Sequence, residues 1–292
     1  MNGSQDLFQQ ALTMWNWEPS ILIGMGIWIG GYFWLTRPGR RNPPWGRVPL
    51  ARKLVFSLGT LVALLALITP IDYIADNYLF SAHMIQHLLL IMVVPPLWLL
   101  GLPDDFIDGL KLPGWAEALI GWVTRPAVAF LIFNAVLLIW HVPALYEATL
   151  ENEGLHIFEH LLFMGTAMVG WWPVLGRSNR VAPQLSRPLQ VLYMFLMMFP
   201  STLLGAIITF ARQPLIPFYA TAPRLWQIAA APGQAAAPAG ASAGWGLSVM
   251  DDQQAAGLLM WIPGNMVYMG FLFYFLYTWL NEMDRETGEH FE

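Results

Sequence analysis

Cysteine is absent from the 292 residues of this chain, and charged residues are scarce. Without cysteine the protein has no disulfide, no thiolate metal site and no thiol redox chemistry. Asp, Glu, Lys and Arg make up 11% of the residues, against about 25% in a typical soluble domain. This deficit indicates that lipid, rather than water, surrounds most of the surface. The net charge of −5 is too diffuse to indicate a nucleic-acid partner.

Long apolar runs make up much of the sequence. A helix of about 20 apolar residues crosses a bilayer, and lipid tolerates no unpaired backbone groups, so these runs must be helical. We therefore predict an all-α fold, a polytopic transmembrane bundle of about seven helices that forms a single membrane domain over residues 1–292. The predicted spans are 20–36, 51–70, 81–101, 126–142, 155–175, 188–211 and 255–280.

The distribution of lysine and arginine predicts the orientation in the membrane. The loop between the first two predicted spans, 37–53, is rich in basic residues, and such loops remain in the cytoplasm. The N-terminus is then outside and, with an odd number of spans, the C-terminus is cytoplasmic. Among the 14 basic residues only Arg212 and Arg224 fall outside. The Ala, Gly and Pro-rich stretch 229–244 is expected to be a flexible linker on the outer side.

Five of the six histidines gather at the predicted outer face. His83 and His87 begin the third span, and His156 and His160 begin the fifth. Each pair is spaced four residues apart and so shares one face of its helix. His141 ends the fourth span, which runs outward and reaches the same surface. We therefore expect these three spans to pack together around one outer cavity.

Imidazole suits copper and zinc, and two imidazoles four residues apart can present two nitrogens to one ion. Carboxylates nearby can bind the ion or fix the histidine tautomers. The candidate carboxylates are Asp72, Asp76, Glu159, Asp251 and Asp252. Met84 and Met250 could add thioether ligands, which favour Cu(I). The sixth histidine, His290, lies in the predicted cytoplasmic tail and has no expected role.

Three interpretations of the histidines remain open. Histidines at helix ends often only anchor the helix, but ionisable groups within spans are costly and usually functional. Two pairs and a fifth histidine on one side therefore favour a metal site over a metal-free scaffold. Histidines from two helices could also hold haem. Haem needs only two axial ligands, however, so the additional histidine and the carboxylates favour a metal ion.

Two other features carry structural expectations. Pro95 and Pro96, in the middle of the third span, are expected to kink that helix. Trp171 and Trp172, near the end of the fifth span, are expected to form part of an aromatic belt at the inner face. Neither feature alone indicates a function.

The histidine-bearing segments resemble the CtaG family of bacterial cytochrome c oxidase assembly factors, the multi-span kind associated with caa-type oxidases. The matching segments are His83-Met-Ile-Gln-His87 followed by Pro95-Pro96, Trp140-His141-Val-Pro-Ala-Leu-Tyr146, His156-x-x-Glu159-His160 with Trp171-Trp172-Pro173, and Asp252-Gln253-Gln254 running into 257–264. Together they extend over the third to seventh predicted spans. The first two spans match only in general character.

The resemblance implies a non-enzymatic role in the maturation of cytochrome c oxidase, through the supply of copper. It implies a location in the bacterial inner (plasma) membrane and cytochrome c oxidase subunits as partners. The metal ligands that it implies are His83, His87, His141, His156, His160 and Asp252. Haem as the cofactor and a metal-free scaffold remain the alternatives.

Overall fold

The computed structural model describes residues 10–37, 45–222 and 248–288, and within them every regular element is helical. In chain order the elements are α2 (Pro19–Leu35), α3 (Leu50–Ile68), α4 (Pro70–Asn77), α5 (Phe80–Leu88), the π-helical turn η1 (Leu89–Val93), α6 (Val94–Gly101), α7 (Phe106–Gly109), α8 (Gly114–Val123), α9 (Pro126–Trp140), α10 (Pro143–Glu151), α11 (Glu153–Leu175), α12 (Arg187–Phe210), α13 (Pro217–Thr221) and α14 (Val249–Gly288). The all-helical fold class is thus confirmed. The predicted linker 229–244 lies outside the described residues.

Apolar helices long enough to cross a membrane are present, but fewer than seven stand out by length and composition. Among the described residues there are four: α3, the continuous run from α5 to α6, α12 and α14. The pair α8 and α9, bent by 72°, would make a fifth if it forms one span. The apolar α2 has only 17 residues, and the 23-residue α11 carries polar side chains in its first turns. The number seven and the orientation of the termini therefore stay predictions.

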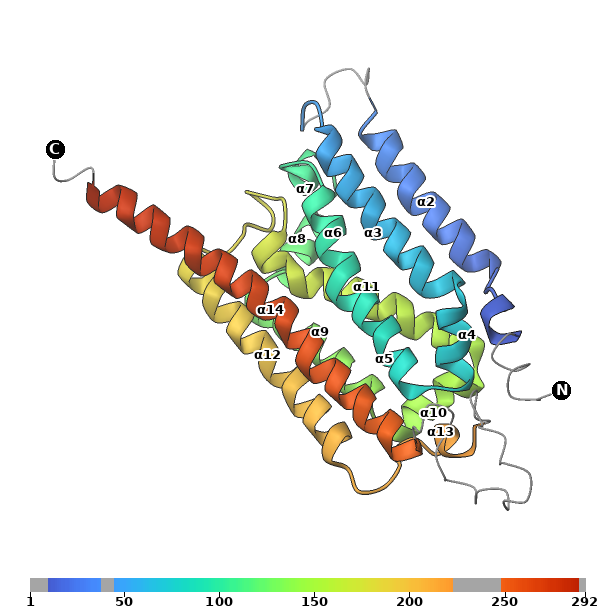
Figure 1. Ribbon diagram of the computed structural model, residues 1–292. Helices are drawn as coiled ribbons and strands as arrows, with labels where there is room; N and C mark the ends of the chain where they lie inside the picture. Colours follow the sequence, from blue (N-terminus) through green and yellow to red (C-terminus); the bar gives the residue numbers. More distant parts are fainter. Residues whose placement is uncertain (1–9, 38–44, 223–247, 289–292) are drawn as a thin grey trace, which may run out of the picture.

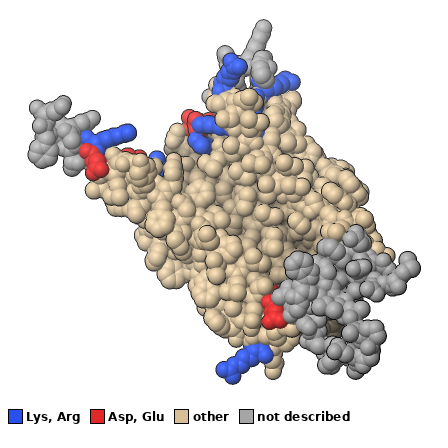
Figure 2. Space-filling model, viewed as in Figure 1, with Lys and Arg blue, Asp and Glu red and all other residues tan. Residues whose placement is uncertain are grey.

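The helices run between two opposite ends of the molecule (Figure 1). α4, α10 and α13 lie at one end, which we call the histidine end because the two histidine pairs lie beside them. α7 and the start of α3 lie at the other, which we call the basic end. Most visible Lys and Arg side chains gather there, and much of the surface between the two ends carries no charge (Figure 2). This distribution is the one expected of a bundle that crosses a bilayer.

The paired prolines break the regular helix where the sequence predicts an irregularity. Pro95 has no N–H, so the carbonyl of Ile91, four residues earlier, loses its helical partner. The chain widens into η1 just before the prolines, and the indole nitrogen of Trp171 donates to that carbonyl at 3.0 Å. Trp171 is fully buried, and Trp172 is also buried, donating to the carbonyl of Ala182. The expected aromatic belt is therefore wrong at these two residues, which hold α11 against its neighbours.

Two glycines let α12 and α14 pack backbone against backbone. A Cβ added at Gly205 would lie 2.8 Å from the carbonyl oxygen of Gly257, and one added at Gly257 would lie 2.7 Å from that of Gly205. Small residues allow this close approach between membrane helices, where no hydrophobic effect drives association. The pair fixes the start of α14, which also packs against α5.

Candidate metal site

The two histidine pairs converge on one point. His83 and His87 of α5 and His156 and His160 of α11 each offer a ring nitrogen that lies within 4.8 Å of the other three. The four side chains are buried. In a tetrahedral site with metal–nitrogen bonds of about 2.0 Å, the ligand nitrogens lie about 3.3 Å apart. We call these four residues the four-histidine group. A small contraction of the group would therefore place all four nitrogens around one ion.

The convergence follows from how α5 and α11 begin. Both start at the histidine end (Figure 1), so the first two turns of each carry its pair at the same depth. Asn152 caps α11, its side chain accepting from the backbone N–H of Leu155 at 2.9 Å. Such a cap satisfies one of the N–H groups that the first turn leaves unpaired. The helix starts, rather than the loops, position the imidazoles.

Asp252 of α14 caps α5 instead of joining the four-histidine group. Its carboxylate accepts from the backbone N–H groups of Phe80 (2.8 Å) and Ser81 (3.1 Å) and from the Ser81 hydroxyl. A negative charge at a helix N-terminus also interacts favourably with the helix dipole. Asp252 therefore fixes the start of α5 against α14, and with it the position of His83.

The hydrogen bonds of His83 define its tautomer. The hydroxyl of Tyr219 in α13 donates its one hydrogen to the carbonyl of Ala75 at 2.8 Å. Its oxygen must therefore accept from Nδ1–H of His83, which lies at 3.2 Å. Nε2 of His83 is then left with its lone pair, and it lies 2.9 Å from Nε2 of His87. No sequence signal indicates Tyr219, which lies 136 residues from His83.

Asp76 of α4 is the carboxylate nearest to the four-histidine group. Its two oxygens lie 3.7 Å from Nδ1 of His83 and 3.4 Å from Nδ1 of His156. A carboxylate facing Nδ1 favours the tautomer whose Nε2 is free to bind a metal, a common arrangement behind metal-bound histidines. Burial, followed by the negative charges of Asp72 and Glu159, raises the pKa of Asp76 well above its usual value. A cation nearby would offset these effects.

His141, the fifth predicted ligand, lies beside the group but is not one of the four. Its ring centroid is 6.3 Å from that of His87. Its Nδ1 lies 2.7 Å from the carbonyl oxygen of Leu137, which can only accept, so Nδ1 carries the hydrogen. Nε2 of His141 thus keeps its lone pair, and it is buried without a hydrogen-bond partner among the described residues.

Several polar atoms around the site are buried and have no hydrogen-bond partner in the described part of the chain. They are Nδ1 of His87, Nε2 of His141, His156 and His160, Oδ1 of Asp76 and both carboxyl oxygens of Glu159. Leaving such an atom unpaired costs about 1–3 kcal/mol, so native proteins keep few of them. Their concentration at one point indicates a ligand that would satisfy them.

A cavity of about 500 Å³ connects the histidine end to the site. His156 and His160 line it, and so do five carboxylates, those of Glu18, Asp72, Asp76, Glu151 and Glu153. No Lys or Arg is among the described residues that line it. Asp72 is held by Asn16 (2.8 Å) and Gln86 (2.6 Å), while burial raises its pKa to about 6. The cavity is suited to a small cation rather than to an anion.

Buried histidines beneath an acidic cavity, within a bundle of apolar helices, define an integral membrane protein with a candidate metal site. The sequence model of one family, described as cytochrome c oxidase caa3 assembly factor (Caa3_CtaG), matches residues 30–282. The chain therefore belongs to this family, and its role lies in the assembly of cytochrome c oxidase. The match runs from α2 into α14 and includes both histidine pairs. No curated protein and no solved structure matches the chain significantly.

Proposed function

We propose that this assembly factor binds a copper ion on its four-histidine group and supports the insertion of that ion into cytochrome c oxidase. The observation that carries the proposal is the convergence of four buried ring nitrogens within 4.8 Å of one another. Imidazole is a preferred ligand of copper, and an assembly factor for a copper-containing oxidase has a use for that ion. The setting that fits this role is the plasma membrane of a bacterium.

The ligand set suits transfer better than storage. Because the chain has no cysteine, no thiolate can hold the ion in the tight manner of a cysteine cage. Neutral imidazoles release copper to a partner that offers a stronger site, and no chemical step on the ion is required. The protein then acts as a chaperone for the metal and not as an enzyme.

The acidic cavity supports the same proposal by giving the ion a path. A cleft whose charges share one sign raises the local concentration of an oppositely charged ion and speeds its association. Asp76 lies where this cavity meets the four-histidine group, within 3.7 Å of His83 and 3.4 Å of His156. A cation that enters among the carboxylates would reach the imidazoles without crossing an apolar barrier.

Haem is less well suited to this geometry. Two of the histidines would be its axial ligands, and the other two, within 4.8 Å of both, would occupy the space that the macrocycle needs. A single metal ion can use all four nitrogens.

Elemental analysis and an optical spectrum of the full chain, purified from its native membrane, test the proposal. We expect bound copper and no Soret band. His83→Ala and His160→Ala should lose the copper and leave the client oxidase short of it, while the protein still accumulates in the membrane. His290→Ala, in the predicted cytoplasmic tail, is the matched control. Variants that keep their copper and mature the oxidase fully would contradict the proposal and favour a metal-free scaffold.

A further inference from the structure

A line of metal-binding side chains continues along α11 beyond the histidine pair. His156, His160, Met164 and Met168 follow one another at intervals of four residues. Residues four apart lie on neighbouring positions of one helix face, and each step advances about 6 Å along the helix axis. The line therefore leads from the acidic cavity, past the four-histidine group, toward the basic end.

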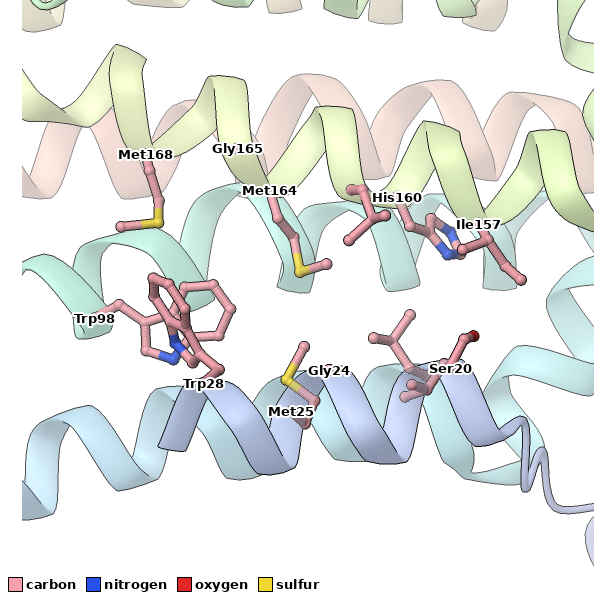
Figure 3. Close-up of a pocket in the computed structure, with 13 residues that line it drawn as sticks. Ser20, Gly24, Met25, Trp28, Trp98, Ile157, His160, Met164, Gly165 and Met168 are labelled. Atoms are coloured by element: carbon pink, nitrogen blue, oxygen red, sulfur yellow. The ribbon is translucent and has the colours of Figure 1, made fainter. Parts of the chain in front are cut away.

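The two methionines face a second, apolar pocket of about 300 Å³ between α11 and α2. Figure 3 shows Met164 and Met168 on one side of this pocket and Met25 of α2 on the other, with their side chains directed into the space between the helices. The rings of Trp28 and Trp98, 5.0 Å apart, lie at one end. No charged residue is among the described residues that line the pocket. We call it the thioether pocket.

His160 belongs to both compartments. It lines the acidic cavity and the thioether pocket, and its Nε2 is buried without a hydrogen-bond partner in the described part of the chain. One imidazole thus separates a polar, carboxylate-lined space from an apolar, sulfur-lined one. An ion held by the four-histidine group would already be bound to the residue that forms the wall of the second pocket.

Thioether sulfur is a neutral, soft ligand that selects Cu(I) over hard divalent ions. Met25, Met164 and Met168 add no charge that the apolar surroundings would destabilise, and three rotatable bonds let each sulfur adapt to an ion. In a packed core methionine serves to fill gaps, yet here three of them surround a gap that they leave open.

We infer that the thioether pocket is a second copper site, selective for Cu(I), with Met25, Met164 and Met168 as its ligands and His160 as the link to the four-histidine group. Movement between the two sites exchanges copper–nitrogen bonds for copper–sulfur bonds. Copper stays Cu(I) throughout, so no electron or proton is transferred. The inference rests on the proposed function only for the source of the ion.

X-ray absorption at the copper edge tests this directly, because in a chain without cysteine any copper–sulfur signal must come from methionine. The probe is Cu(I), added anaerobically to the full chain in detergent at two equivalents. We expect two ions per chain and both nitrogen and sulfur neighbours. Replacing Met25, Met164 and Met168 together by Leu should leave one ion and remove the sulfur signal. Met→Leu conserves volume, so the fold should persist.

The matched control replaces Met194, Met266 and Met269, which do not line the pocket, by Leu and should leave both signals unchanged. If the triple variant fails to fold, the single variants Met25→Leu, Met164→Leu and Met168→Leu should each weaken the sulfur signal, and a signal that none of them changes would overturn the inference. Copper bound through nitrogen alone would overturn this inference and leave the proposed function standing. Sulfur-bound copper that persists in a His83→Ala, His87→Ala variant would support the thioether site independently. A wild-type chain that binds no Cu(I) at all would overturn both.

Discussion

The two ends of the molecule are both rich in polar side chains, yet they use them in opposite ways. At the basic end most polar side chains pair with one another, although Nε of Arg177 is buried without a partner among the described residues. Asp104 accepts from Arg52 and Arg177, each at 2.8 Å, and Asp108 accepts from the hydroxyl of Ser178 and from the backbone N–H groups of 179–181. At the histidine end, several imidazole and carboxyl atoms are buried without hydrogen-bond partners among the described residues. Paired groups stabilise the fold, whereas unpaired buried groups reduce stability and are retained for a ligand.

The pKa values of two carboxyl groups outside the predicted spans show the same contrast. The hydrogen bond from Arg52 lowers the pKa of Asp104, since a neighbouring cation favours the carboxylate. Burial raises the pKa of Asp72 to about 6, although Asn16 and Gln86 donate hydrogen bonds to it. The first carboxylate already has its cation. The second belongs to a cavity that has none among its described lining residues.

The largest expected effect is on metal binding at the histidine end. His160→Leu should remove copper from the four-histidine group because it removes one of four convergent ligands. It should leave the free energy of unfolding of the copper-free protein unchanged or raise it by about 1 kcal/mol, since it removes an unpaired buried polar atom. Copper titration and denaturant unfolding in detergent measure the two quantities. A variant that loses much stability without copper would show that His160 serves the fold.

A smaller effect is expected at Asp76, which faces two of the ligands without belonging to the group of four. Asp76→Asn should weaken copper binding by about 10–100-fold, the usual consequence of removing a carboxylate behind a metal-bound histidine. The number of ions bound should stay the same. Competition with a chelator of known affinity gives the ratio. Equal affinities would remove Asp76 from the site.

At the basic end the same kind of substitution should affect stability and not copper. Asp108→Ala removes the acceptor of four hydrogen bonds, from the Ser178 hydroxyl and three backbone N–H groups. We expect the free energy of unfolding to fall by roughly 1–2 kcal/mol, because water can replace part of the loss at this half-buried place. Copper affinity should be unchanged. Weakened copper binding in this variant would mean that the two ends are coupled.

The smallest effect is expected for the exposed ion pair between Arg180 and Glu117, whose nitrogen–oxygen distances are 2.9 and 2.7 Å. Exposed ion pairs gain little, because solvent screens them and two long side chains must be held in place. Glu117→Gln should change neither unfolding nor copper binding measurably. A clear loss of stability would show that the surface ion pairs of the basic end contribute to the free energy of unfolding.

Local patterns in the sequence predict much of the site. The spacing of four residues places each histidine pair on one helix face, and the apolar runs predict the helices that carry them. Because α5 and α11 both begin at the histidine end, the convergence of the pairs follows from direction alone. The same logic brings His141 beside the group, where its ring centroid is 6.3 Å from that of His87, but its exact position depends on the turn that follows its helix.

Contacts between distant segments could not be predicted. Asp252 has the chemistry of a ligand, and only packing across 172 residues makes it the cap of α5. Tryptophan is common at membrane interfaces, yet Trp171 lies in the interior. There it donates a hydrogen bond to the carbonyl of Ile91, which Pro95 leaves without its helical partner. The polar first turns of α11 and the bend between α8 and α9 likewise obscure how many helices span the membrane.

One copper titration tests the central account most directly. The purified full chain receives one equivalent of copper, and bound copper is compared between two variants. In the first, His83, His87, His156 and His160 are replaced by Ala, and in the second His141 and His290 are replaced. The account predicts that X-ray absorption finds no nitrogen-bound copper in the first variant and one nitrogen-bound ion per chain in the second. Nitrogen-bound copper retained by the first variant would contradict it.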